Sequence, residues 1–300
     1  MNRFLCIVLI AAISMAAVSC KKDGVFSPKE KIVAVYHQET KVLNGETTTV
    51  GKYKSEEWIW DGNLLKEMVS YNEDGTSAGK RLLSYEGKRL VKLSDESGDY
   101  YTEYVYKSGK LTKISMVSGG EVLFAADVEH DGSFISKMKM SVDIPDSIGA
   151  DFAKRSLSMV VPQPVADMVV PTASSRTKQA MAISLNFSYS DKNMTKLAVV
   201  VSGMTLMTVN FTYDKMKNPM QGCYATLGPS VLSKNNIVES KSGGLINNMP
   251  IEGLSLPTNQ KYSYTYNADD YPESVTTTSS TTEEDLTTTT TSTTYYEYGE

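Results

Sequence analysis

A short spacing pattern recurs along the first two thirds of the sequence and restricts what the chain can fold into. An aromatic residue is followed by an apolar residue five positions later and by another eight positions later. Copies begin at Trp60, Tyr85, Tyr106 and Tyr189, and one at His130 keeps the spacing without the aromatic ring. Adjoining copies start 21 to 25 residues apart, which is the length of two short strands with their turns. The repeat therefore predicts a succession of β-hairpins.

Turn-forming dipeptides separate these copies and the runs around them. Asn-Gly and Asp-Gly tolerate the positive φ that tight hairpins need. The intervening runs are rich in Tyr, Val, Thr and Ile, which favour strands. The pattern predicts an all-β fold, an antiparallel meander of hairpins. The predicted turns are Asn44-Gly45, Asp61-Gly62, Asp74-Gly75, Glu86-Gly87, Ser108-Gly109 and Asp131-Gly132.

The spacing leaves the register after each turn open. A four-residue turn places the aromatic residue opposite the residue at plus five, on one face. In a regular strand the residue at plus seven shares that face and the one at plus eight points away. Either both faces are partly covered, or a β-bulge shifts the register. Four of the copies have lysine at plus seven: Lys92, Lys113, Lys137 and Lys196.

Pairs of aromatic residues at a spacing of two form a second pattern, as at Trp58 with Trp60 and along Tyr262, Tyr264 and Tyr266. Period two places each set on one face of a sheet. Such rows form ligand platforms for sugars, but they also form ordinary β cores, which we consider the simpler interpretation.

The first nineteen residues predict a signal peptide. Arg3 is followed by a run from Phe4 to Val18 that is apolar except for Ser14. Fifteen helical residues reach about 22 Å, short of the roughly 30 Å of a bilayer core. Residues 1–19 are therefore expected to direct secretion rather than to span a membrane.

The end of this segment resembles a lipobox. Ala17-Val18-Ser19 precedes Cys20, and the resemblance implies that the Cys20 thiol carries a diacylglyceryl group. Several acyl chains, palmitate among them, would anchor the chain in a membrane. A plain cleavage site is the alternative. Asp does not follow Cys20 directly, which by bacterial sorting rules implies the outer membrane, at its periplasmic face or at the cell surface. Residues 20–30 are then a tether.

We expect residues 31–300 to form one β domain with an irregular insertion at 141–180. That insertion contains Pro145, Pro162, Pro164 and Pro171 and few strand signals. It also contains Asp146-Ser147-Ile148, which matches a short pattern that Bacteroidota glycosylate on oxygen. Ser147 is therefore a candidate glycosylation site.

The segment from Thr276 to Thr294 is rich in threonine. It is either a flexible stalk or a two-stranded ribbon that turns at the acidic residues Glu283, Glu284 and Asp285. Threonine is β-branched, which favours the ribbon.

Composition excludes several functions. The net charge of −5 argues against a nucleic-acid-binding surface, which needs clustered lysine and arginine. Of the three cysteines, Cys6 leaves with the signal and Cys20 takes the lipid, so Cys223 stands alone. No intramolecular disulfide is expected, and the fold must rest on packing.

The sequence predicts no catalytic residue, metal site or cofactor, and hence no enzyme. It lacks the motifs of serine hydrolases, zinc proteases and phosphate-binding loops. His37 and His130 are expected on strands or their edges, partly exposed. Cys223 is expected to be a small buried hydrophobe. Glu283, Glu284 and Asp285 are expected to be solvated turn residues rather than calcium ligands.

Motifs after Phe187 resemble a known family. The chain is similar to Bacteroidota lipoproteins of unknown function that are described as having a porin-like fold, and this family brings no known catalytic residues. The residues that carry the resemblance are Phe211-Thr-Tyr213-Asp214, Asn218-Pro219, Leu232-Ser233-Lys234-Asn235-Asn236, Tyr264-Thr-Tyr266-Asn267, Tyr271-Pro272 and Tyr295-Tyr296-Glu297-Tyr298.

The resemblance does not imply a pore. A membrane barrel needs strands of about ten residues with an apolar outer band, whereas lysines at plus seven interrupt the strands here. We expect a curved antiparallel sheet or a partly open soluble barrel.

Three functions follow from these expectations. The first is a non-catalytic lipoprotein that binds a glycan or a protein partner, which predicts exposed aromatic residues with polar neighbours. The second is a periplasmic carrier of a lipophilic ligand, which predicts a dry cavity lined by Val199, Val201, Met204 and Leu206. The third is a hydrolase with an unrecognised site of converging acids. The oligomeric state stays open.

Overall fold

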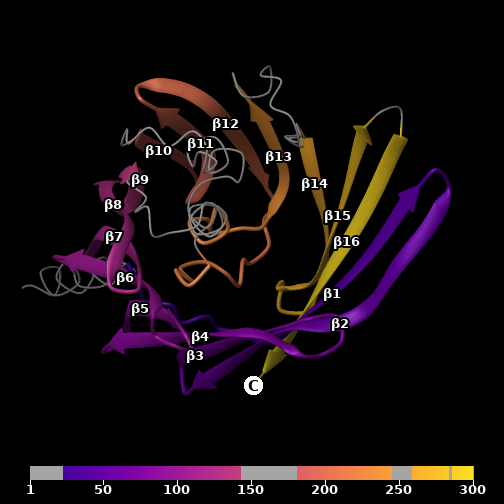
Figure 1. Ribbon diagram of the computed structural model, residues 1–300, viewed down its shortest axis with the longest axis horizontal. Coiled ribbons are helices and arrows are strands. Elements are labelled where there is room, and N and C mark those ends of the chain that lie inside the picture. Colours follow the sequence, from indigo (N-terminus) through magenta and orange to yellow (C-terminus); the bar gives the residue numbers. More distant parts are fainter. Residues whose placement is uncertain (1–22, 143–180, 227, 245–258, 284–285, 300) are drawn as a thin grey trace, which may run out of the picture.

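The structure, a computed structural model, describes residues 23–142, 181–226, 228–244, 259–283 and 286–299. Its strands form a closed barrel in which each strand is antiparallel to the next along the chain (Figure 1). Within the described ranges the elements are all strands, and no helix there is long and apolar enough to cross a membrane. The all-β meander predicted from the sequence is confirmed.

The barrel has sixteen strands, which differ in length. They are β1 (Lys31–Leu43), β2 (Glu46–Asp61), β3 (Leu64–Tyr71), β4 (Ser77–Glu86), β5 (Arg89–Asp95), β6 (Tyr100–Lys107), β7 (Lys110–Ser118), β8 (Glu121–Asp131), β9 (Phe134–Val142), β10 (Met181–Ser190), β11 (Asn193–Val201), β12 (Met204–Tyr213), β13 (Ile237–Gly243), β14 (Asn259–Tyr266), β15 (Pro272–Glu283) and β16 (Leu286–Gly299).

The first and last strands close the barrel. They pair from Lys31 opposite Gly299 to Leu43 opposite Thr288. This corrects the expectation of a curved sheet or a partly open barrel. Closure pairs the backbone groups of both edge strands and so removes the exposed edges that an open sheet would have.

The turns lie alternately at two ends of the barrel, because neighbouring strands are antiparallel. We call the end at which β1 begins and β16 finishes the proximal end, and the opposite end the distal end. All six turn dipeptides predicted from the sequence fall at strand-to-strand connections. Asn44 and Gly45, for example, have φ values of 51° and 83°, as a tight hairpin requires.

A β-bulge sets the register of every copy of the sequence repeat. Trp60 lies opposite Leu65, and the ladder shifts by one residue directly before Trp60. The bulge brings the residues at plus five and plus eight to the same face, inside the barrel, and turns the lysines at plus seven outward. The same pairing and the same shift occur at Tyr85 with Leu90, Tyr106 with Leu111, His130 with Ile135, and Tyr189 with Met194.

The aromatic residue of a copy also fastens neighbouring hairpins together. The Tyr85 hydroxyl donates to the carbonyl oxygen of Leu65, 2.6 Å away, which is the plus-five residue of the preceding copy. Tyr106 donates in the same way to Leu90, at 2.8 Å. Two further hydroxyls repeat the contact along the chain, Tyr189 to Ile135 at 2.8 Å and Tyr213 to Met194 at 2.6 Å.

The inner and outer faces of the wall differ in polarity. The inner face carries fully buried apolar side chains such as Leu65, Met68 and Ile114. Burying a side chain of this size stabilises the fold by about 1.5–3 kcal/mol. The outer face carries ion pairs, among them Lys80–Glu67 at 3.0 Å. Between β15 and β16 it carries rows of threonine hydroxyls that bond each other, as Thr276 does with Thr293 at 3.0 Å.

The threonine-rich segment forms the predicted ribbon. β15 and β16 pair from Ser274 opposite Tyr295 to Glu283 opposite Leu286, while residues 284 and 285 lie outside the described residues. Of the predicted insertion at 141–180, residues 141 and 142 belong to β9 and residues 143–180 lie outside the described residues.

Candidate binding cavity inside the barrel

The connection between β12 and β13, residues 214–236, enters the barrel, and we call it the plug. Figure 1 shows it within the ring of strands. Cys223, Tyr224 and Val231 of the plug are buried in the same apolar cluster as the inner wall. The hydroxyl of Tyr104 on β6 donates to the carbonyl oxygen of Tyr224 at 2.9 Å. The plug therefore fills part of the lumen that the wall encloses.

Amide and carboxylate side chains fix both ends of the plug. Asp214 accepts hydrogen bonds from the backbone N–H groups of Met216, at 3.0 Å, and Asn236, at 3.1 Å, and from the Tyr266 hydroxyl. Asn235 and Asn193 bond each other twice, at 2.9 and 3.1 Å. These hydrogen bonds pair buried polar groups of the backbone, which would destabilise an internal loop if they had no partner.

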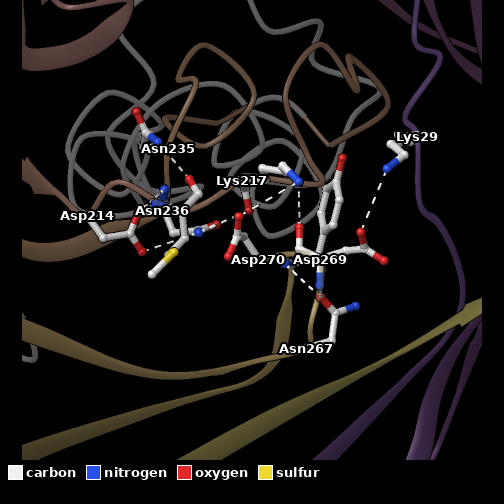
Figure 2. Close-up of polar contacts among 10 residues, drawn as sticks. Lys29, Asp214, Lys217, Asn235, Asn236, Asn267, Asp269 and Asp270 are labelled. Atoms are coloured by element: carbon white, nitrogen blue, oxygen red, sulfur yellow. Dashed lines mark hydrogen bonds and ion pairs between the residues drawn. The ribbon is translucent and has the colours of Figure 1, made fainter.

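A polar network ties the plug to the proximal end of the barrel (Figure 2). Lys217 donates to the carbonyl oxygen of Asp269 at 2.6 Å, and its backbone N–H donates to Asp270 at 3.0 Å. Lys29 forms an ion pair with Asp269 at 3.8 Å. Lysines thus balance the two acids of the β14–β15 turn. Among the described residues no group of three or more histidine, cysteine, aspartate or glutamate side chains could hold a metal ion.

The segment before β1 packs against the same end. Phe26 is buried with its ring 5.7 Å from that of Trp60. The carboxylate of Asp23 lies 2.8 Å from Nε2 of His130 and accepts a hydrogen bond from the backbone N–H of Leu111 at 2.9 Å. His130 as a whole is partly exposed, as the sequence suggested, but its side chain is only 6% exposed and holds the N-terminal segment.

A cavity of about 810 Å³ lies between the plug and the wall formed by β1, β2 and β12–β16. The plug side is formed by residues such as Asn218, Pro219, Met220 and Pro229. The wall contributes the polar side chains His37, Ser55, Glu56, Thr277, Ser292 and Thr294. It also contributes the aromatic side chains Tyr53, Trp58, Phe211, Tyr262, Tyr264 and Tyr296.

Three polar groups of the cavity have no hydrogen-bond partner within the part of the chain that the structure describes: the Tyr53 hydroxyl, the Tyr296 hydroxyl and the His37 imidazole. No fully buried side-chain nitrogen or oxygen of the described residues lacks a partner. These three groups must therefore contact open space, which is the cavity that they line. Burial raises the pKa of Tyr296 to about 12, so its hydroxyl stays protonated and can donate or accept.

Glu56 is the one residue with a carboxylate among the described residues that line the cavity. It accepts a hydrogen bond from Trp58 Nε1 at 2.8 Å and forms an ion pair with Arg81 at 3.2 Å. Glycoside hydrolases ordinarily use two carboxylates that flank the scissile bond.

The other residues singled out in the sequence lie elsewhere. Cys223 is buried in the plug, and burial raises the pKa of its thiol to about 12. Cys20, Ser147, Glu284 and Asp285 lie outside the described residues. Four residues were expected to line a dry cavity, but none of them lines the cavity described above: Val199, Val201 and Leu206 are buried in the core, and Met204 is 57% exposed.

The aromatic rows at period two lie partly in the core and partly on the cavity wall. Trp58 is 4% exposed within the core cluster and also lines the cavity. Tyr262 and Tyr264 line the cavity from β14. The plug itself was not predicted. Its asparagines resemble those of surface loops, and only the closed wall around them makes them internal.

The sequence matches none of the protein-family models and none of the curated proteins with which it was compared. Among solved structures it is similar to a porin-like protein from Bacteroides uniformis ATCC 8492. The two share 10% sequence identity with a TM-score of 0.49, and the alignment covers 88% of this chain and 97% of that one.

Proposed function

We propose that this chain is a lipid-anchored, non-catalytic binding protein that takes a short neutral glycan into the cavity of its barrel. The observation that carries the proposal is the combination of aromatic side chains with unpaired hydroxyl and imidazole groups on one cavity wall. A sugar ring offers C–H groups on its faces and hydroxyls on its edges. Aromatic faces and free hydrogen-bonding groups match these two surfaces.

The size of the cavity supports a small ligand. Pockets for small molecules commonly occupy about 300–1,000 Å³, and this cavity has about 810 Å³. A polar group that is left unpaired in such a site favours ligands that supply its partner. Tyr53, Tyr296 and His37 would therefore select a hydroxyl-rich ligand.

A lipophilic ligand has less support. A second void among the described residues, lined mainly by apolar side chains such as Leu111, Met138 and Leu197, has a volume of only about 60 Å³. That is the space of about two water molecules, too small for an acyl chain.

The polar outer wall supports the proposal that the barrel is surrounded by water and is held at the membrane by lipid on Cys20. Ion pairs such as Lys80–Glu67 and Lys139–Glu129 lie where a membrane barrel has an apolar band. With the signal sequence, this favours an outer-membrane lipoprotein that projects from the bilayer.

The binding test compares two neighbouring tyrosines on β16. Tyr296 lines the cavity, whereas Tyr295 faces outward and donates to Gln38 at 2.9 Å. Calorimetric titration of neutral linear hexasaccharides, namely an α-glucan, a β-mannan and a β-xylan, should identify a ligand for the wild-type chain. Tyr296→Phe should then weaken binding about tenfold, because one hydrogen bond is lost. Tyr295→Phe should leave the affinity unchanged.

If the two variants bind the saccharide with equal affinity, the binding site does not lie in the cavity. Absence of binding to every saccharide, together with saturable binding of a fatty acid, would replace this proposal with the carrier function. Hydrolysis of a bound saccharide by the wild-type chain would contradict the non-catalytic assignment.

A further inference from the structure

We infer that the barrel stands end-on on an anionic lipid surface, with its proximal end against the headgroups and its distal end directed away. This inference rests on the lipid attachment at Cys20 that we propose above. Two independent features of the described residues carry it, the position at which the N-terminal segment is held and the distribution of charge between the two ends.

The N-terminal segment is held at the proximal end from Asp23 onward. Asp23 contacts His130 and Leu111, and its carboxylate is shielded from solvent. The carbonyl oxygen of Gly24 accepts a hydrogen bond from the backbone N–H of Leu90 at 2.9 Å, and Val25 pairs with Arg89. The chain is therefore fixed to the barrel before β1 begins.

This attachment leaves a very short link to the lipid. Only residues 21 and 22 separate Asp23 from Cys20. Three residues of fully extended chain span at most about 11 Å. The acyl chains on Cys20 must therefore enter the bilayer within about 11 Å of the proximal end.

The turns at the two ends carry different charges. Among the described turns and the strand ends that flank them, the distal end has carboxylates and neither lysine nor arginine. These distal acids are Glu46, Glu73, Asp74, Asp95, Glu96, Asp99 and Glu121. The proximal end carries acids as well, but basic residues in its turns and strand ends balance them, among them Lys88, Arg89, Lys107, Lys110 and Lys192.

An anionic membrane repels the acidic distal end more strongly than the proximal end, where lysines and arginines offset the acids. The effect falls off within a Debye length, about 8 Å at physiological ionic strength. A ten-residue strand tilted as in a barrel is about 25 Å tall. When the proximal end lies on the surface, the distal acids are therefore farther from the membrane charges than the range of this repulsion. The charge distribution and the short link select the same orientation.

The test uses two exposed serines in turns at opposite ends, Ser133 between β8 and β9 and Ser202 between β11 and β12. In the full lipidated chain with Cys223→Ser, Ser133→Cys and Ser202→Cys are each labelled with the same fluorophore. The protein is reconstituted in vesicles of phosphatidylethanolamine and phosphatidylglycerol that contain a headgroup-attached quencher. We expect quenching at position 133 to exceed quenching at position 202 at least threefold. Equal quenching, or the reverse order, would overturn the inference.

Two controls separate this inference from the proposals on which it rests. Cys20→Ser should release the chain from vesicles. If that variant stays bound as well as the wild type, the lipid attachment fails and the orientation argument falls with it. Glycan titration of the same labelled chains reports on the cavity alone.

Lys107→Glu with Lys110→Glu should reduce the contrast in quenching between the two labels, because these substitutions place acids at the proximal end. A contrast that these substitutions leave unchanged would contradict the electrostatic part of the inference.

Discussion

Nε2 of His130 and Oδ2 of Asp23 lie 2.8 Å apart, although 107 residues separate them in the sequence. Their side chains are 6% and 13% exposed, so the contact is shielded from water. Asp23→Ala removes this pair and the hydrogen bond to Leu111. We expect the free energy of unfolding to fall by about 3 kcal/mol. Urea unfolding measures this change.

Asp131→Ala is the control for that substitution. Asp131 is the exposed last residue of β8, next to His130 in sequence, and its loss should change the stability by less than about 0.5 kcal/mol. If the free energy of unfolding falls by a similar amount in the two variants, the buried pair contributes little to stability.

Gly24 is expected to tolerate no side chain. Its φ is +72°, and a Cβ atom at this position would overlap the Tyr106 hydroxyl. Gly45 also has a positive φ, +83°, but a Cβ atom there meets nothing within 4 Å. Gly45→Ala should therefore cost about 1–2 kcal/mol through backbone strain alone. Gly24→Ala should cost clearly more and should expose the N-terminal segment to protease.

Thermal unfolding and limited proteolysis of the two glycine variants check this prediction. Cleavage near residue 24 in Gly45→Ala at the rate seen in Gly24→Ala would mean that the segment is loose in the native barrel.

Stability should decline in alkaline solution. Burial raises the pKa of Tyr213, Tyr296 and Cys223 to about 12 each. In the unfolded chain these groups ionise near their ordinary values, about 10 for tyrosine and 8.5 for cysteine. Between about pH 9 and 12 the unfolded state therefore binds fewer protons than the folded state, and the free energy of unfolding falls as pH rises. Below about pH 7 these groups add no pH dependence.

Urea titrations at pH 8, 10 and 11, with tyrosinate absorbance as an independent signal, measure the alkaline decline. Tyrosinate formation with an apparent pKa near 10 for all tyrosines, before unfolding, would contradict the burial of Tyr213 and Tyr296.

The thiol of Cys223 should be unreactive in the native chain. With a pKa of about 12 the reactive thiolate is rare at pH 8, about one molecule in ten thousand. Alkylation by iodoacetamide should therefore be at least a thousandfold slower than in urea-unfolded protein. Mass spectrometry after timed quenching gives both rates. Comparable rates would place Cys223 at an accessible surface.

The hairpins could be predicted from the sequence because their determinants are local. A turn dipeptide and an apolar pair five residues apart fix a hairpin such as Trp60 with Leu65. The spacing was compatible with two registers after each turn, and the structure has the one with a β-bulge. Closure could not be predicted in this way, because Lys31 and Gly299 meet only when the whole meander is complete.

The candidate site escaped prediction for a related reason. His37 and Trp58 lie on the β1–β2 hairpin, and Tyr296 on β16 joins them only through closure. The plug faces all three only because it lies inside the barrel. A sixteen-stranded barrel is too wide for its wall side chains to fill alone. Knowledge of the strand number would therefore have indicated that some segment must occupy the lumen.

The contact between each aromatic hydroxyl and the carbonyl oxygen of the preceding hairpin makes the wall modular. Tyr106, for instance, bonds Leu90 and needs nothing from more distant strands to do so. Inserting or deleting one such unit changes the circumference by two strand spacings, about 9.6 Å, and leaves the neighbouring junctions intact. The bore of this barrel can therefore be adjusted in discrete steps by duplication of about two dozen residues.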